Sequence, residues 1–268
     1  MIDLHCHLLH GIDDGPETMD QSLALARAAC NTGITTIFAT PHYRAGRFDT
    51  TPEQIRAKTA ELNAELKNNQ IPLQVLAGQE IRVYEGLLED LEAGKVLPLG
   101  NSQYVLLEFS SSLLPYRFED TLHELLIAGW RPIIAHPERN AEIAEAPEKL
   151  AELVRQGAYC QVTSHSLTGR FGRKVKSLAI EMGRRNIVHF IASDAHNETT
   201  RPYELVAAYK TAAAKIGAEL ADSYLSNAQA VLHNIPLEPL KPRVMSNYVR
   251  QLRLFAGWSP FKTQDGGS

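Results

Sequence analysis

The feature that most constrains the fold of this chain is a regular alternation of short apolar runs with longer helical patterns. Short runs rich in β-branched and apolar residues predict buried strands. There are seven of them: Ile2–Leu4, Thr35–Ala39, Gln74–Ala77, Tyr104–Leu107, Pro132–Ala135, Ala158–Val162 and Ile187–Ala192. Seven strand–helix units without a break in composition predict an α/β fold, built as a parallel sheet or a barrel within one domain.

Helical signals fill the intervals between these runs. Capping-box patterns at Thr18–Gln21 and Thr51–Gln54 predict the starts of two helices. Glycine follows three of the later helical segments, as is typical of helix C-termini. Those later segments are Glu119–Ala128, Pro147–Gln156, Arg173–Arg184 and Pro202–Lys215.

The charge balance argues against one broad class of function. The 268 residues include 27 Lys+Arg and 31 Asp+Glu, which gives a formal net charge of −4. A protein that binds nucleic acid mainly through bulk positive charge has the opposite balance, so we expect no nucleic-acid partner. Hydrophobic residues make up 44% of the chain and charged residues 22%, the proportions of a globular protein with a sizeable core.

The cysteines and the apolar runs indicate the compartment. Three cysteines are too few and too scattered for a disulfide framework, which favours a reducing environment. No apolar run approaches the length of about 18 residues that a membrane span needs. The first residues also lack the basic and apolar regions of a signal peptide. We therefore expect a cytoplasmic protein with at most peripheral membrane association.

The C-terminal residues depart from the alternating pattern. Leu237–Leu240 is interrupted by proline, Met245–Phe255 has a basic helical pattern, and Thr263–Ser268 is typical of a frayed tail. We therefore predict a main domain over 1–236 and a helical appendage with a frayed tail over 237–268. A basic amphipathic helix is compatible with a homo-oligomer or with recruitment to a membrane surface, and on periodicity alone equally with a helix that packs on the main domain.

Polar side chains gather directly after the predicted strands. His5 and His7 close the first strand, and their imidazoles point the same way because alternate residues of an extended segment share a face. The carboxyl ends of parallel barrel strands meet at one end of the fold, where active sites lie. Nine candidates follow six of the strands, and they are His5, His7, Asp14, His42, Glu80, Glu108, His136, Asp194 and His196.

This set of side chains indicates a metal centre with more than one ion. Five imidazoles and four carboxylates are too many ligands for one ion, and the mixture suits Zn, Mn or Fe. Shared carboxylates can bridge ions about 3.5–4 Å apart, and such sites activate a bound water near neutral pH. A lone His-x-His pair is usually incidental, but an incidental explanation would have to hold separately at six strand ends.

Two arginines lie close to this cluster in the sequence. Arg139 follows His136 by three residues, and Arg201 follows His196 by five. A guanidinium is always charged and grips phosphoryl oxygens through a planar fork. The alternative for each arginine is a surface ion pair, which is the stronger alternative for Arg201. Two divalent ions would balance the four ligand carboxylates and three would outweigh them, so with two arginines nearby we expect an anionic substrate.

The order and spacing of these residues resemble a known superfamily. The segments MIDLHCHLLHGIDDGP, ATPHY, LLEFS, IIAHPER and IASDAHN…RP are similar to motifs of the polymerase and histidinol phosphatase (PHP) superfamily. Within it they resemble the bacterial capsular-polysaccharide type of metal-dependent protein-tyrosine phosphatase. The resemblance covers roughly residues 1–235.

The resemblance implies a fold, a cofactor and a partner. The fold is a distorted (β/α)7 barrel of the PHP type, here over 1–236. The cofactor is a set of three divalent metal ions, usually manganese, with iron or zinc as alternatives. The partner is the phosphotyrosine tail of a membrane-associated bacterial tyrosine kinase that regulates capsular and exopolysaccharide synthesis. The implied reaction is hydrolysis of phosphotyrosine by a phosphoric monoester hydrolase.

The resemblance also implies a role for each candidate residue. Arg139 and Arg201 match the catalytic arginines that bind phosphate in the family. The ligands of the three ions are His5, His7, Glu80 and Asp194 for the first; Glu80, Glu108 and His136 for the second; and Asp14, His42 and His196 for the third.

Two other functions remain open on the sequence alone. A small-molecule phosphatase, such as a histidinol-phosphate phosphatase, would use the same ligands but requires a closed pocket. A non-catalytic PHP module, of the kind attached to DNA polymerases, is the more distant alternative, because this chain has a complete ligand set and no polymerase.

Cys6 is not expected to be a nucleophile. Its side chain should point to the opposite face of the strand from His5 and His7. Ile12 occupies the position where a cysteine-dependent phosphatase would have its arginine. We therefore predict a metal-dependent, cysteine-independent reaction.

Overall fold

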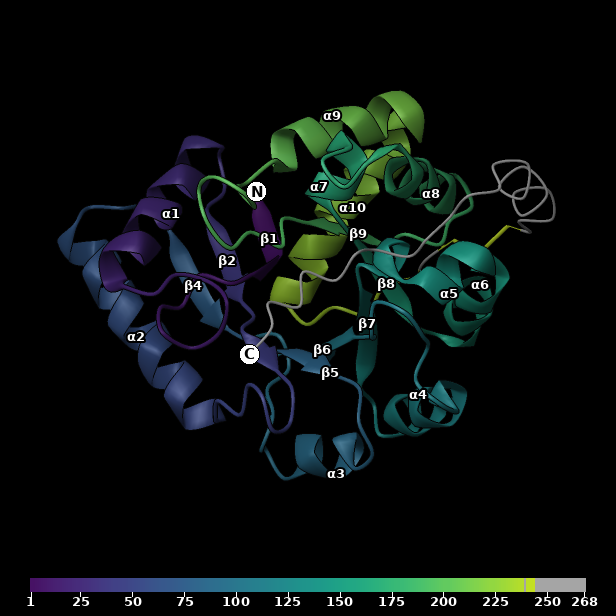
Figure 1. Ribbon diagram of the computed structural model, residues 1–268, viewed down its shortest axis with the longest axis horizontal. Coiled ribbons are helices and arrows are strands. Elements are labelled where there is room, and N and C mark those ends of the chain that lie inside the picture. The colour runs from purple at the N-terminus through teal and green to yellow at the C-terminus, as the bar shows by residue number, and fades with distance from the viewer. Residues whose placement is uncertain (239, 244–268) are drawn as a thin grey trace, which may run out of the picture.

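The computed structural model describes residues 1–238 and 240–243 of the chain. The predicted helix Met245–Phe255 and the predicted tail Thr263–Ser268 lie outside the described residues. Figure 1 shows the strands at the centre of the molecule with helices packed around them. In the described ranges no helix is both long enough and apolar enough to cross a bilayer.

The strands form two sheets, and every strand pairing in them is parallel. The first sheet has the order β1-β2-β4, with strands β1 (Ile2–Cys6), β2 (Thr36–Ala39) and β4 (Gln74–Ala77). The second has the order β3-β5-β6-β7-β8-β9, with strands β3 (His42–Tyr43), β5 (Glu80–Arg82), β6 (Tyr104–Glu108), β7 (Arg131–Ala135), β8 (Tyr159–Thr163) and β9 (Phe190–Ala192). The predicted mixed α/β fold with parallel strands is confirmed.

Each of the seven predicted strands overlaps an observed one, but β3 and β5 were not predicted. They arise because the chain breaks after β2 and after β4 and then resumes pairing in the second sheet. Pro41 has no N–H to continue the ladder of β2. Gly78 ends β4, and a Cβ there would lie only 3.1 Å from the side chain of Leu99. The polar residues His42 and Glu80 therefore begin separate short strands.

Backbone contacts also join the first strand to the last one. The end of β1 forms a parallel bridge between Cys6 and Ala195, just beyond β9. The amide of His7 donates to the carbonyl of Ala195 at 2.9 Å, and the amide of Asp194 donates to the carbonyl of His5 at 2.8 Å. The segments that carry the two predicted i, i+2 ligand pairs are therefore hydrogen-bonded neighbours.

Helices cover the outside of both sheets (Figure 1). Thr51 forms both hydrogen bonds of the predicted capping box, and Pro52 occupies the first position of the helix it caps. The described helices are α1 (Met19–Asn31), α2 (Pro52–Asn68), α3 (Leu87–Glu92), α4 (Phe118–Ile127), α5 (Ala141–Glu145), α6 (Pro147–Gln156), α7 (Ser164–Thr168), α8 (Arg173–Arg184), α9 (Leu205–Lys215), α10 (Ala218–Leu232) and a 3-10 helix over Pro137–Arg139.

The last described helix, α10, closes the amino ends of the strands. Val231 belongs to a buried cluster with Leu4, Tyr104 and Phe190, which come from β1, β6 and β9. The hydroxyl of Tyr104 donates to the carbonyl of Ile235 at 2.7 Å, so the chain after α10 crosses the same end. Apolar packing at this end leaves the carboxyl ends of the strands as the place for polar side chains.

Candidate metal centre

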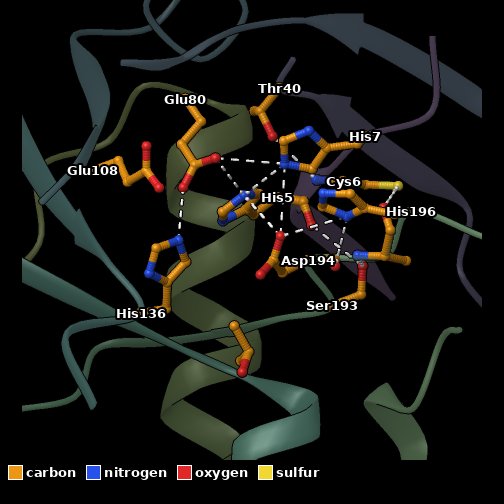
Figure 2. A network of polar contacts seen from close by, with 12 residues as sticks. His5, Cys6, His7, Thr40, Glu80, Glu108, His136, Ser193, Asp194 and His196 are labelled. Carbon is orange, nitrogen blue, oxygen red and sulfur yellow. Dashed lines mark hydrogen bonds and ion pairs between the residues drawn. The ribbon is translucent and has the colours of Figure 1, made fainter. Parts of the chain in front are cut away.

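All nine side chains that the sequence singled out as metal ligands lie together near the carboxyl ends of the strands, and most of them are labelled in Figure 2. Each belongs to at least one group whose ligand atoms lie within 4.8 Å of one another. The groups are His7, Asp14, His42 and His196; His5, His7 and Glu80; His5, His136 and Asp194; and His42, Glu80 and Glu108. Their role as ligands remains a prediction.

Four atoms on the buried floor of the centre have the spacing of a coordination shell. His5 Nε2 lies 3.3 Å from His7 Nε2, 3.3 Å from Asp194 Oδ1 and 3.4 Å from Glu80 Oε2. Two ligands that each lie about 2.0–2.1 Å from one ion at tetrahedral or octahedral angles are about 2.8–3.4 Å apart. These side chains come from β1, from β5 and from the segment after β9, so three distant parts of the chain supply one shell.

Glu80 occupies the middle of the centre and faces imidazoles on several sides. Its Oε1 lies 2.7 Å from His136 Nε2, and its Oε2 lies 2.7 Å from His42 Nδ1. Asp14 extends the cluster toward solvent, with Oδ1 3.2 Å from His196 Nε2 and 3.5 Å from His42 Nε2. The two oxygens of Glu80 face different imidazoles, and a carboxylate placed like this is suited to bridge neighbouring cations.

The electrostatics of Glu80 fit a bound cation. The residue is fully buried, and its Oε2 lies 2.7 Å from His42 Nδ1 but accepts no hydrogen bond of good geometry from the described residues. Burial opposes ionisation, but the nearby imidazoles of His5 and His42 hold the pKa of this carboxyl well below its usual range. A buried, ionised carboxylate is costly unless positive charge compensates it. The residues present therefore fit divalent metal ions.

Two further residues orient the imidazoles of the first strand. Asp13 Oδ2 lies 2.6 Å from His7 Nδ1, and Gln161 Oε1 lies 3.0 Å from His5 Nδ1. Partners of this kind fix the ring so that Nε2 points to the metal. Neither residue was predicted from the sequence. Gly15, two residues after Asp13, is the feature of the sequence that could have indicated a tight turn around Asp13. Its amide donates to Asp13 Oδ1 at 3.0 Å, and a Cβ at this position would lie 2.6 Å from the His7 carbonyl.

The backbone that presents Asp194 is strained and is held by a buried clamp. Asp194 has a φ of +54°, in the left-handed region, which costs about 1–3 kcal/mol for such a residue. The preceding Ser193 donates its amide to Asp3 Oδ1 at 2.9 Å and its hydroxyl to Asp3 Oδ2 at 2.5 Å. Asp3 therefore fixes the turn that aims Asp194 at the centre.

Both predicted arginines lie at the edge of the centre and contact Asp194. Arg139 Nη1 is 2.6 Å from Asp194 Oδ2, and Arg201 also forms an ion pair with that oxygen. Burial opposes ionisation of Asp194, but Arg201 and the neighbouring His5 hold its pKa well below the usual range. Both arginines therefore form ion pairs with a buried carboxylate of the centre, and their catalytic role stays a prediction.

Two arginines that the sequence analysis missed contact Glu108. Arg44 Nη2 lies 2.7 Å from Glu108 Oε1, and Arg82 Nη2 lies 3.0 Å from Glu108 Oε2. Each follows a candidate ligand by two residues, at His42 and Glu80. Residues i and i+2 of a strand share a face, but neither β3 nor β5 was predicted, so this periodicity could not be applied.

Comparisons with known proteins agree with this geometry. A family model described as capsular polysaccharide synthesis, CpsB/CapC, matches residues 1–233. The chain belongs to the CpsB/CapC family. The tyrosine-protein phosphatase YwqE of Bacillus subtilis is 40% identical over 253 residues, which cover 92% of this chain and 100% of YwqE. The tyrosine-protein phosphatase CpsB of Streptococcus agalactiae serotype III is 32% identical over 240 residues, which cover 87% of this chain and 99% of that protein.

A solved structure gives the same family. It comes from work on YwqE of Bacillus subtilis and CpsB of Streptococcus pneumoniae, described as unique metal-dependent tyrosine phosphatases. It superposes on this CpsB/CapC chain with a TM-score of 0.89 at 40% sequence identity, and it covers 91% of this chain and 98% of its own. The predicted resemblance to the capsular-polysaccharide type of metal-dependent tyrosine phosphatase is confirmed.

Cys6 of this CpsB/CapC protein lies outside the cluster of ligand atoms, as predicted. Its side chain is fully buried in the apolar core, and its Sγ lies 2.9 Å from the hydroxyl of Tyr203. Burial raises the pKa of this thiol well above its usual value. A buried, protonated thiol is a poor nucleophile, and the cysteine-independent reaction stays a prediction.

Proposed function

We propose that this protein hydrolyses phosphotyrosine on protein at a centre of three divalent metal ions, with manganese as the first candidate and iron or zinc as alternatives. The observation that carries the proposal is the convergence of nine candidate ligand side chains in overlapping groups, two of which share the buried carboxylate of Glu80. Membership of a family whose relatives are tyrosine-protein phosphatases supports the reaction type.

We assign the ligands of each ion as the family resemblance implies. The spacing of the four floor atoms supports the first set, and the bridging position of Glu80 supports its membership of two sets. The sets are His5, His7, Glu80 and Asp194 for the first ion; Glu80, Glu108 and His136 for the second; and Asp14, His42 and His196 for the third.

Arg139 and Arg201 would bind the phosphoryl group. When bound, the metal ions supply an activated water as nucleophile and neutralise charge on the phosphoryl oxygens. Both guanidiniums form ion pairs with Asp194. The side chains of Arg139 and Arg201 are 30% and 24% exposed, so both can reach a substrate that enters from solvent. Fixed cations at this position stabilise the negative charge that develops on the phosphoryl oxygens during the reaction.

We also propose that the two sheets together form the distorted (β/α)7 barrel of the PHP type. Counting β2 with β3 and β4 with β5 gives seven strand positions, and the bridge between Cys6 and Ala195 supports closure between β1 and β9. In this proposal the barrel spans 1–236 and the C-terminal appendage spans 237–268.

The proposed substrate is the phosphotyrosine tail of a membrane-associated bacterial tyrosine kinase that regulates capsular and exopolysaccharide synthesis. The family description, capsular polysaccharide synthesis, supports this setting. The three free cysteines support action in the cytoplasm. Peripheral membrane association or a homo-oligomer would involve the C-terminal appendage.

The exposure of the centre favours a protein substrate over a small-molecule one. A histidinol-phosphate phosphatase requires a closed pocket, whereas the side chains of Asp14, Arg82 and Arg139 are 50%, 31% and 30% exposed. The edge of the centre is therefore open to solvent. A non-catalytic module is disfavoured because the relatives of this chain are named as enzymes.

Metal content tests this proposal directly. Protein stripped with a chelator and reloaded with Mn²⁺ should bind three ions per chain and regain hydrolysis of a phosphotyrosyl peptide in parallel. Active protein with at most one tightly bound ion would contradict the trinuclear assignment. Full activity of the stripped protein would contradict the metal-dependent reaction.

A further inference from the structure

A short ordered loop, Arg44–Phe48, follows β3 beside the metal centre, and we call it the rim loop. Its two ends are joined by backbone hydrogen bonds in both directions, from Arg44 to Phe48 at 3.0 Å and from Phe48 to Arg44 at 2.9 Å. Asp49 Oδ1 accepts a hydrogen bond from the amide of Gly46 at 2.8 Å, and Gly46 has a φ of +78° that favours glycine. The loop is therefore closed at its base and presents its side chains in a defined arrangement.

The rim loop places an aromatic ring at the edge of the centre. The ring of Phe48 stacks on that of His42, with centroids 5.5 Å apart and an interplanar angle of 23°. The guanidinium carbons of Arg44 and Arg47 lie 5.9 and 5.4 Å from the centroid of Phe48. Phenyl and guanidinium groups together are suited to an aromatic ligand that carries negative charge.

Positive charge is in excess at this edge. Arg44 and Arg82 share the single carboxylate of Glu108. Arg47 is exposed, and among residues 1–238 and 240–243 no carboxylate lies within ion-pair distance of it. The formal charge of the whole chain is −4, so this local excess runs against the overall balance. An uncompensated, exposed guanidinium beside a centre for phosphate is placed to contact a second anionic group.

We propose that the rim loop, together with Arg82, is the element that recognises the phosphotyrosyl peptide. Phe48 packs against the tyrosine ring, and Arg47 binds a second anionic group of the same peptide, with Arg44 and Arg82 adding to the positive field. A phosphotyrosine whose phosphoryl group reaches the buried ligands leaves its ring at the edge, where a phosphoserine has none. The second anion is an acidic side chain or a second phosphate. This inference rests on the proposed phosphatase function.

The charge part of the proposal is tested with three peptides of equal length. One has glutamate next to the phosphotyrosine, one has glutamine there, and one has a second phosphotyrosine. Arg47→Gln should reduce kcat/KM on the two anionic peptides, relative to the glutamine peptide, by about threefold to tenfold. The matched control is Arg155→Gln, an exposed arginine that pairs with Glu152 on α6, and it should leave all three values unchanged.

A binding measurement separates recognition from turnover. Fluorescence anisotropy with labelled peptides that contain a non-hydrolysable phosphonate should show the same weakening in Kd for Arg47→Gln. The difference between wild type and variant should disappear at high salt, because exposed charge pairs are screened. A larger loss on the doubly anionic phosphopeptide than on the glutamate peptide would identify phosphate as the preferred second anion.

The aromatic part is tested with Phe48→Leu, which keeps apolar volume but removes the ring. The ratio of kcat/KM for a phosphotyrosyl peptide to that for the matching phosphoseryl peptide should fall by about threefold to tenfold. An equal loss on both peptides would mean that Phe48 only supports His42, and it would overturn this part of the proposal.

The outcomes distinguish this inference from the function on which it rests. Wild-type protein that hydrolyses no phosphotyrosine with Mn²⁺ overturns the proposed function, and the inference with it. Wild-type protein that is active, combined with an Arg47→Gln variant whose peptide preference and Kd stay within about twofold of wild type, overturns the inference alone.

Discussion

Replacing Asp13 by asparagine should weaken metal binding without unfolding the protein. The carboxylate accepts three hydrogen bonds, from His7 Nδ1 at 2.6 Å, from the amide of His42 at 3.0 Å and from the amide of Gly15 at 3.0 Å. In Asp13→Asn one of the two oxygens becomes an NH2 group, so at least one of these donors loses its acceptor. The supporting negative charge on His7 is lost as well.

The size of the effect follows from what Asp13 holds in place. Losing an outer partner of a ligating histidine costs about 10–100-fold in metal affinity, or about 1.4–2.7 kcal/mol. Asp13 supports His7 and the backbone of His42, which are proposed ligands of two different ions. We therefore expect the weakening at two of the three ions.

The assay is a Mn²⁺ titration of chelator-stripped protein, followed by calorimetry and by recovery of phosphotyrosine hydrolysis. Asp13→Asn should require about 10–100-fold more Mn²⁺ for half-maximal recovery. Asp222→Asn, an exposed acid on α10, is the matched control and should behave as wild type. A folded Asp13→Asn protein with unchanged Mn²⁺ affinity would refute the argument that this residue orients His7.

Three further predictions concern other parts of the molecule. Cys6→Ser should keep most phosphatase activity in a peptide assay, and loss of turnover in a well-folded variant would overturn the cysteine-independent reaction. His136→Ala or Asp194→Ala should lower kcat by orders of magnitude, because a lost ligand misplaces an ion; near-normal kcat would remove that residue from the centre. Burial lowers the pKa of His189 from 6.5 to about 3. Between these pH values the imidazole is protonated in the unfolded state and neutral in the folded state, so the free energy of unfolding decreases as the pH falls from 6.5 to 3. His189→Asn, which keeps an acceptor for the amide of Cys160, should reduce the loss in free energy of unfolding between pH 6.5 and pH 5 by about 2 kcal/mol in urea titrations, and an unchanged pH dependence would contradict this origin.

The convergence of the nine candidate ligands could be predicted because it depends only on the position of each residue directly after a strand. Each follows a predicted strand, and parallel strands carry their carboxyl ends to the same place. His5, Glu80 and Asp194 are therefore neighbours in space although they are far apart in the sequence. The family resemblance added the expected number of ions and the substrate, which residue types alone left open.

The supporting residues could not be predicted in the same way. Gln161 contacts His5 across 156 positions of sequence, and nothing in its own strand marks it as a partner. Arg44 and Arg82 depend on β3 and β5, short strands that exist only because the chain breaks and changes sheet. Helix α10 was missed because its N-cap, Gly217, also follows the preceding helix, where a glycine is typical of a helix C-terminus.

The most direct test of the central claim compares two substrates in the presence and absence of metal. The purified full chain is assayed on a phosphotyrosyl peptide and on histidinol phosphate, with Mn²⁺, after chelation, and after Mn²⁺ is restored. The metal-centre account predicts preferred hydrolysis of the peptide, loss of that activity on chelation and its return with Mn²⁺. Preferred hydrolysis of histidinol phosphate, or peptide hydrolysis that survives chelation, would contradict it.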